Sequence, residues 1–170
     1  MGFKIRFVQE PASWGATLTE ITKIDSRMTL RVDKWLGGGN YVKNVKDFVF
    51  QVINECSVRN DVIDQLNISG HGSNAHFRIG NDAITGDSLV GFSDELRKIV
   101  PHLNPKGLVV LETCHAGEAG SLMGFFSQVL GGIKVVGRED TQNAWTGPEG
   151  TPYTVQDPDS FGPTPNSNVG

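Results

Sequence analysis

The sequence has few cysteines and no long apolar run. Cys56 and Cys114 are the only two cysteines among 170 residues, too few for a disulfide framework, which favours a reducing, cytoplasmic compartment. No apolar run approaches the about 20 residues that a membrane helix requires, and the first ten residues lack the apolar core and cleavage site of a signal peptide. We therefore expect a cytoplasmic protein with no membrane partner, and a fragment of a secreted or toxin-like polypeptide stays open as the alternative.

An excess of basic residues is also missing. The 15 Lys and Arg residues are scattered against 19 Asp and Glu residues, and the formal net charge is −4, so no basic stripe is available for a phosphate backbone. The sequence also lacks a phosphate-binding glycine loop before Lys-Ser or Lys-Thr. Nucleic acids and nucleotides are therefore not expected partners, whereas proteins, peptides and small molecules remain. The sequence leaves the oligomeric state open.

Apolar periodicity along the chain indicates alternating strands and helices. Such alternation predicts an α/β fold with a largely parallel sheet covered by helices through right-handed crossovers. The composition changes after residue 145 to Pro, Gly, Ser, Asn and Asp, which predicts a domain over 1–145 and a tail or strap over 146–170. We expect strands at 3–8, 28–32, 108–113 and 133–137 and a further strand that ends at residue 69, a hairpin with its tip at 80–82, and helices at 41–56, 87–102 and 121–130, the second capped by Asp87 or Ser88.

Two segments share one layout, an apolar strand that ends in a small turn. The first, 61–72, reads DVIDQLNISGHG, and the second, 106–117, reads KGLVVLETCHAG. Because the carboxyl ends of parallel strands meet at one edge of a sheet, His71 and Cys114 are expected to share a site there. A thiol beside an imidazole is typical of a cysteine nucleophile with an acid–base partner. Backbone N–H groups of Gly72 and Cys114 are candidates for an oxyanion hole.

The two blocks ISGHG and LETCHAG resemble the signature blocks of caspase-like cysteine peptidases, above all metacaspases. The resemblance implies a three-layer α/β sandwich with a mostly parallel sheet and helices on both faces. It also implies a thiol protease, a hydrolase in which Cys114 is the nucleophile and His71 the base or leaving-group acid, acting on protein substrates or on its own chain. The pattern departs from metacaspases at Glu112, Thr113 and Ala116, where that family has Asp, Ser and Ser.

The same resemblance implies substrate-binding positions. Glu112 occupies the place of an Asp that binds a basic substrate residue in metacaspases, which implies cleavage after Arg or Lys; the alternative for Glu112 is a surface cap of a strand end. Arg138 and Glu139 fall in the region that shapes the substrate groove, and their opposite charges leave the preference undecided. No cofactor is expected, and no calcium-binding loop is recognisable.

Other interpretations of these residues stay open. His71, His76, Cys114 and His115 form a possible zinc set, although the usual paired ligand spacings are absent. His115 adjoins Cys114, but neighbouring side chains diverge in an extended turn, so His115 is not the expected partner. Cys56 lies on the apolar face of a predicted helix and is expected in the core. The alternative to an enzyme is a catalytically silent, caspase-like interaction module of a larger polypeptide.

Overall fold

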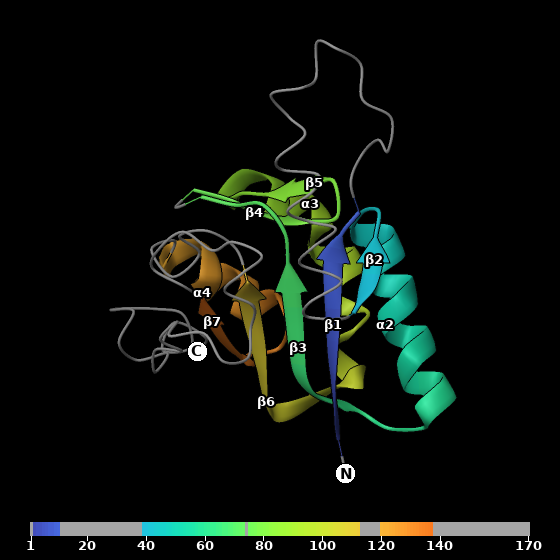
Figure 1. Cartoon of the computed structure of the whole chain (residues 1–170). Helices are drawn as coiled ribbons and strands as arrows, with labels where there is room; N and C mark the ends of the chain where they lie inside the picture. Colours follow the sequence, from blue (N-terminus) through green and yellow to red (C-terminus); the bar gives the residue numbers. More distant parts are fainter. Residues whose placement is uncertain (1, 11–38, 74, 113–119, 138–170) are drawn as a thin grey trace, which may run out of the picture.

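A computed structural model of the chain describes residues 2–10, 39–73, 75–112 and 120–137. Its centre is a five-stranded sheet in the order β2-β1-β3-β6-β7, in which every neighbouring pair is parallel, beside a two-stranded antiparallel hairpin, β4-β5 (Figure 1). The elements are β1 (Phe3–Gln9), β2 (Asn40–Val42), α2 (Val45–Arg59), β3 (Ile63–Ser69), β4 (Phe77–Ile79), β5 (Asp82–Ile84), α3 (Gly86–Arg97), the 3-10 turn η2 (Val100–His102), β6 (Leu103–Glu112), α4 (Gly120–Val129) and β7 (Lys134–Gly137).

The described helices form one layer on one face of the sheet. Helix α3 contacts both α2 and α4, and the three helices belong to the connections from β2 to β3, from β3 to β6 and from β6 to β7. These connections advance in the same direction across the sheet, so right-handed crossovers bring all three helices to the same face (Figure 1). The expected α/β fold with a mostly parallel sheet is confirmed.

The apolar core lies between this helix layer and the sheet. Alternate residues of each strand point to opposite faces, and the residues of one parity join the helix side chains in a single cluster. Phe7 packs edge-on against Phe48 of α2, with ring centroids 5.3 Å apart, and Phe77 packs against Phe126 of α4 at 4.9 Å. The strand residues of the cluster include Ile5, Phe7, Leu66, Ile68, Val109, Leu111 and Val135. The residues of the other parity therefore face away from the helices.

The helix expected at 41–56 begins later in the structure. Residues Asn40–Val42 form strand β2, which pairs with β1, and α2 starts at Val45 because the Asn44 side chain accepts a hydrogen bond from the backbone N–H of Asp47, 2.8 Å away. An Asn side chain that satisfies a free N–H of the first turn is a typical N-cap. The expected start at residue 41 was therefore wrong, since apolar Val42 belongs to the sheet.

The helix expected at 87–102 also has different ends. Its cap is Thr85, whose hydroxyl accepts from the N–H of Ser88 at 3.0 Å while the Ser88 hydroxyl accepts from the N–H of Thr85 at 2.8 Å. This reciprocal pair is a capping box with Ser in place of Glu, so the expected caps, Asp87 and Ser88, were wrong. Helix α3 stops at Arg97, and Pro101 lies in the following 3-10 turn.

The hairpin and the last helix agree with the expectations. Strands β4 and β5 are joined through Gly80 and Asn81, and Gly80 has a φ of +60° with backbone atoms of Lys43 only 2.4 Å from where a Cβ would lie, so a side chain does not fit at this tip. Helix α4 ends at two glycines of positive φ, Gly131 and Gly132, as a left-handed C-terminal cap requires.

Some expected features lie outside the described residues. The strand expected at 28–32 and the tail at 146–170 are among them, as is the domain boundary at residue 145. Among the described helices, none combines the length and apolar character needed to cross a membrane.

Candidate functional site

The carboxyl ends of β3 and β6 lie side by side at one edge of the sheet. Ser69, the last residue of β3, is aligned with Glu112, the last residue of β6, in the parallel register. His71 follows Ser69 by two residues, and Cys114 follows Glu112 by two residues. Neighbouring strands are about 4.8 Å apart, so the two strand ends lie next to each other. Cys114 itself lies outside the described residues, as does Thr113.

The backbone of His71 is fixed by the end of β1. The side-chain oxygen Oε1 of Gln9 accepts a hydrogen bond from the His71 N–H at 2.9 Å, and Gln9 is buried. Gly70 permits this approach, since a Cβ there would lie 2.9 Å from the same Gln9 oxygen. The absence of a side chain at Gly70 therefore lets Gln9 reach the backbone of His71. His71 itself is partly exposed at the edge of the sheet.

The segment after His71 turns back at once. Gly72 forms an isolated antiparallel bridge with Phe77, and the Ser73 N–H donates to the His76 carbonyl at 2.8 Å. The Ser73 hydroxyl and His76 Nδ1 are 2.9 Å apart. The hydrogen bond that closes this turn comes from Ser73 and not from Gly72, so the turn is compatible with the expected use of the Gly72 N–H as an oxyanion donor.

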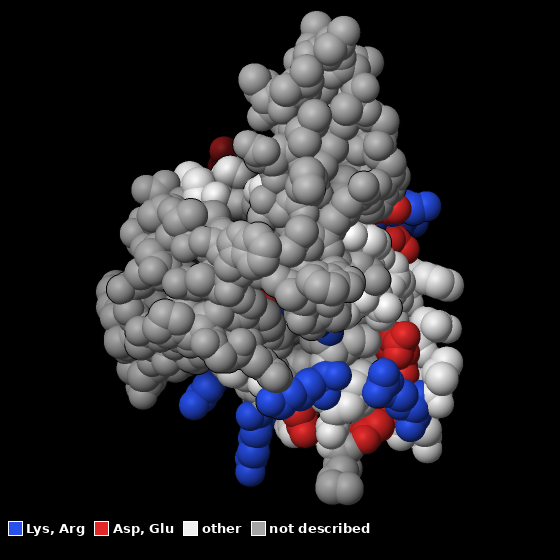
Figure 2. All heavy atoms as spheres, viewed as in Figure 1, with Lys and Arg blue, Asp and Glu red and all other residues white. Residues whose placement is uncertain are grey.

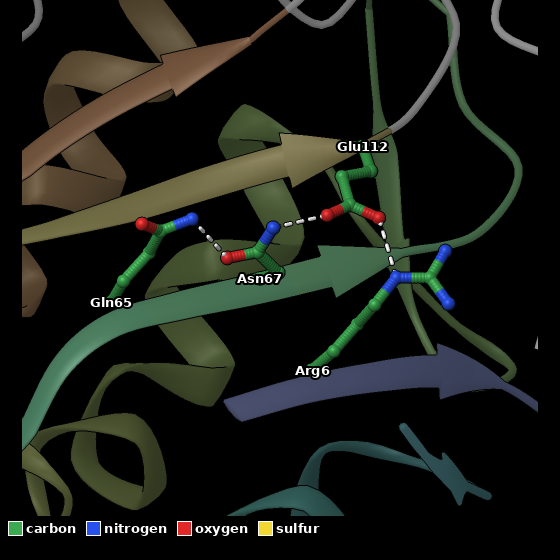
Figure 3. Close-up of polar contacts among 4 residues, drawn as sticks. All are labelled: Arg6, Gln65, Asn67 and Glu112. Atoms are coloured by element: carbon green, nitrogen blue, oxygen red, sulfur yellow. Dashed lines mark hydrogen bonds and ion pairs between the residues drawn. The ribbon is translucent and has the colours of Figure 1, made fainter. Parts of the chain in front are cut away.

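Glu112 belongs to a polar cluster, formed by Arg6, Gln65, Asn67 and Glu112 on the sheet face away from the described helices, in which all but the half-buried Gln65 are buried (Figure 3). One carboxylate oxygen of Glu112 lies 2.7 Å from Nε of Arg6, and the other accepts from the Asn67 side-chain nitrogen. The Gln65 side-chain nitrogen in turn donates to the Asn67 oxygen at 2.8 Å. Gln65 therefore orients the Asn67 amide so that its nitrogen faces Glu112.

This cluster changes the interpretation of Glu112. The residue is 1% exposed, so the alternative of a cap on the surface was wrong. Arg6 is 8% exposed, and its guanidinium compensates the Glu112 charge inside the protein. The carboxylate expected to bind a basic substrate residue thus already has a cationic partner.

Sequence reasoning missed Arg6, Gln9 and Asn67. A signal for Arg6 was present, because a charged residue in the middle of the strand FKIRFVQ has no reason to be buried unless it is paired. The partner was not visible, since Arg6 and Glu112 lie 106 positions apart in the chain. Gln9, at the end of β1, and Asn67, within β3, are uncharged and carry no comparable signal.

The remaining expected site residues lie beyond the described ranges. Arg138 and Glu139, proposed for the substrate groove, are among them, together with Cys114 and His115. Within the described ranges there is no group of three His, Cys, Asp or Glu residues suited to a metal ion. Two members of the possible zinc set, Cys114 and His115, lie outside these ranges.

Cys56 lies in the core, as expected. It is 4% exposed on the inner face of α2, and its thiol is 3.7 Å from the carbonyl oxygen of His102. Burial, followed by the nearby charges of Asp61 and Glu55, raises the pKa of this thiol. Cys56 is therefore protonated at neutral pH and a poor nucleophile.

The described surface carries charges of both signs on the face shown in Figure 2, where Lys and Arg side chains lie next to Asp and Glu side chains.

Comparisons of the chain with family models, with curated proteins and with solved structures find no match in any of the three.

Proposed function

We propose that this protein is a cysteine endopeptidase with a caspase-like fold, a three-layer sandwich, and that Cys114 and His71 form its catalytic dyad. One observation carries the proposal: Ser69 and Glu112 are aligned on neighbouring strands, and the histidine and the cysteine each follow two residues later. Adjacent strand ends allow a nucleophile and its acid–base partner to come within hydrogen-bond reach of each other, which the proposed dyad requires. The sequence blocks around both residues resemble those of metacaspases.

In the proposed reaction the Cys114 thiolate attacks the carbonyl carbon of a peptide bond. The resulting oxyanion accepts hydrogen bonds from the backbone N–H groups of Gly72 and Cys114. His71 donates its proton to the departing amine as the carbon–nitrogen bond breaks, which leaves a thioester on the enzyme. His71 then takes a proton from water while the water oxygen attacks the carbonyl carbon of the thioester. The carbon–sulfur bond breaks, which releases the carboxylic acid product and restores the Cys114 thiolate.

The proposal includes no preference for Arg or Lys in the substrate. That preference depends on Glu112, and Arg6 lies 2.7 Å from its carboxylate. A carboxylate that already faces a buried guanidinium attracts a second cation weakly. The new peptide ends of the cleavage products will identify the residue that precedes the cleaved bond.

Selective alkylation tests the proposal. At neutral pH we expect iodoacetamide to modify Cys114 at least about tenfold faster than Cys56, because the Cys56 thiol is buried and protonated. The alkylated protein should no longer cleave a denatured protein mixture that the untreated protein cleaves. Mass spectrometry identifies both the modified cysteine and the new peptide ends.

The internal reference for this test is Cys56, which reports any loss of the fold during alkylation. Equal, slow modification of both thiols, together with no new peptide ends from the untreated protein, would instead support a silent interaction module. Identical peptide ends before and after complete modification of Cys114 would contradict the proposed nucleophile.

A further inference from the structure

The ion pair between Arg6 and Glu112 joins two strands that are not neighbours. Arg6 is on β1 and Glu112 on β6, and β3 lies between them in the sheet. The register places Arg6 opposite Asn67 on β3, while Glu112 is aligned with Ser69, further along the same face. The Arg6 side chain therefore extends diagonally across β3 to reach the last residue of β6 (Figure 3).

Asn67 connects the middle strand to the same carboxylate. Its side-chain nitrogen donates to the Glu112 oxygen that Arg6 Nε does not contact. Glu112 is thus held through both oxygens, from two different strands. Since each bond acts along its own direction, the two together restrict rotation of the carboxylate as well as its position.

A buried ion pair in this location contributes little net stability to the fold. Both side chains are nearly excluded from solvent, at 8% and 0% exposure, and the desolvation of two buried charges offsets much of their attraction. Apolar residues of similar volume often stabilise a fold equally well. What an apolar pair cannot supply is a directional contact that fixes the end of one particular strand.

We propose that Arg6 is a positioning residue, which fixes through Glu112 the end of β6, the strand that leads to the proposed nucleophile. The inference rests on the proposed function, because it assigns a task to the strand end that precedes the nucleophile. Strand β1 then supports both halves of the dyad: Arg6 holds the end of β6, and Gln9 holds the backbone of His71 at 2.9 Å.

The test replaces the ion pair by apolar residues in the double variant Arg6→Met/Glu112→Met. We expect this variant to remain folded, with kcat lowered by about 10- to 100-fold, since a misplacement of about 1 Å can cost 10²-fold. KM should change less than about threefold, because neither residue contacts substrate in this proposal. The matched control is Lys98→Met/Glu95→Met, which removes an exposed pair with the same 2.7 Å separation and should leave kcat unchanged.

A second measurement does not depend on activity. Hydrogen exchange at the backbone amides of 110–112 should become at least about tenfold faster in the double variant and stay unchanged in the control. If the double variant unfolds, Arg6→Lys serves in its place, since Lys keeps the charge but not the planar guanidinium. That variant should show the same loss in kcat and the same faster exchange.

The two proposals fail in different ways. A double variant with wild-type kcat and wild-type exchange at 110–112 would overturn the positioning role while leaving the peptidase intact. Wild-type protein without any hydrolysis would overturn the peptidase, and the exchange measurement would then decide alone whether Arg6 fixes the strand end.

Discussion

Replacing Cys114 by Ala should lower kcat for peptide hydrolysis by about 10⁴-fold or more, because the other thiol, Cys56, is buried with a raised pKa and cannot take its place. His71→Ala should lower kcat by about 10²- to 10⁴-fold, the usual contribution of general acid–base catalysis. Residues that act as one unit do not contribute additively. The double variant Cys114→Ala/His71→Ala should therefore be no slower than Cys114→Ala alone.

The chain offers a matched control for each residue. His76 is the control for His71, five residues earlier. The His76 ring lies 2.9 Å from the Ser73 hydroxyl and is not part of the proposed dyad, so His76→Ala should keep kcat within about threefold of wild type. Cys56→Ala removes the other thiol and should leave the reaction intact after correction for the folded fraction. Steady-state kinetics on a peptide identified from the cleavage products measures all these variants.

Equal losses for His71→Ala and His76→Ala would instead favour the zinc set, in which both imidazoles are ligands. Zinc content measured on the purified variants would then separate the two interpretations, because loss of a ligand lowers metal affinity. A Cys114→Ala variant that retained hydrolysis at the wild-type rate would sink the proposed mechanism outright.

The single variant Arg6→Met should destabilise the fold by about 3–5 kcal/mol, the usual cost of removing one partner from a buried ion pair. The change takes the guanidinium away from a carboxylate that is 1% exposed. In Arg6→Met/Glu112→Met the negative charge of Glu112 is removed as well. The free energy of unfolding should therefore return to within about 1 kcal/mol of the wild-type value or exceed it. Lys98→Met, at an exposed pair, should cost less than about 1 kcal/mol.

Urea unfolding followed by circular dichroism gives these free energies, provided that the m-values agree among the variants. A single variant as stable as wild type would show that the Arg6 contact contributes little, and would leave the positioning role to the kinetic and exchange measurements. A double variant as unstable as the single one would show that burial of the Glu112 charge is not the source of the cost.

Much of this fold was predictable from local patterns. Period-two alternation and apolar runs located strands β1, β3 and β6, and the turn glycines located the β4-β5 hairpin and the end of α4, because backbone preferences at such positions depend on few neighbours. Alternating strands and helices then indicated a parallel sheet, whose carboxyl edge brings distant turns together. The proposed pairing of His71 with Cys114 follows from that rule.

Other features depended on contacts between distant segments. Asn40–Val42 form a strand because β1 is available to pair with them, although Tyr41 and Val42 fit the apolar pattern of the helix that follows. The environment of Glu112 is the sharper example: by sequence it is a lone acid before a cysteine, and in the fold it faces Arg6 from a strand 106 residues earlier. Local sequence records which side chains are present, whereas the charge balance of a buried site depends on which strands the sheet places side by side.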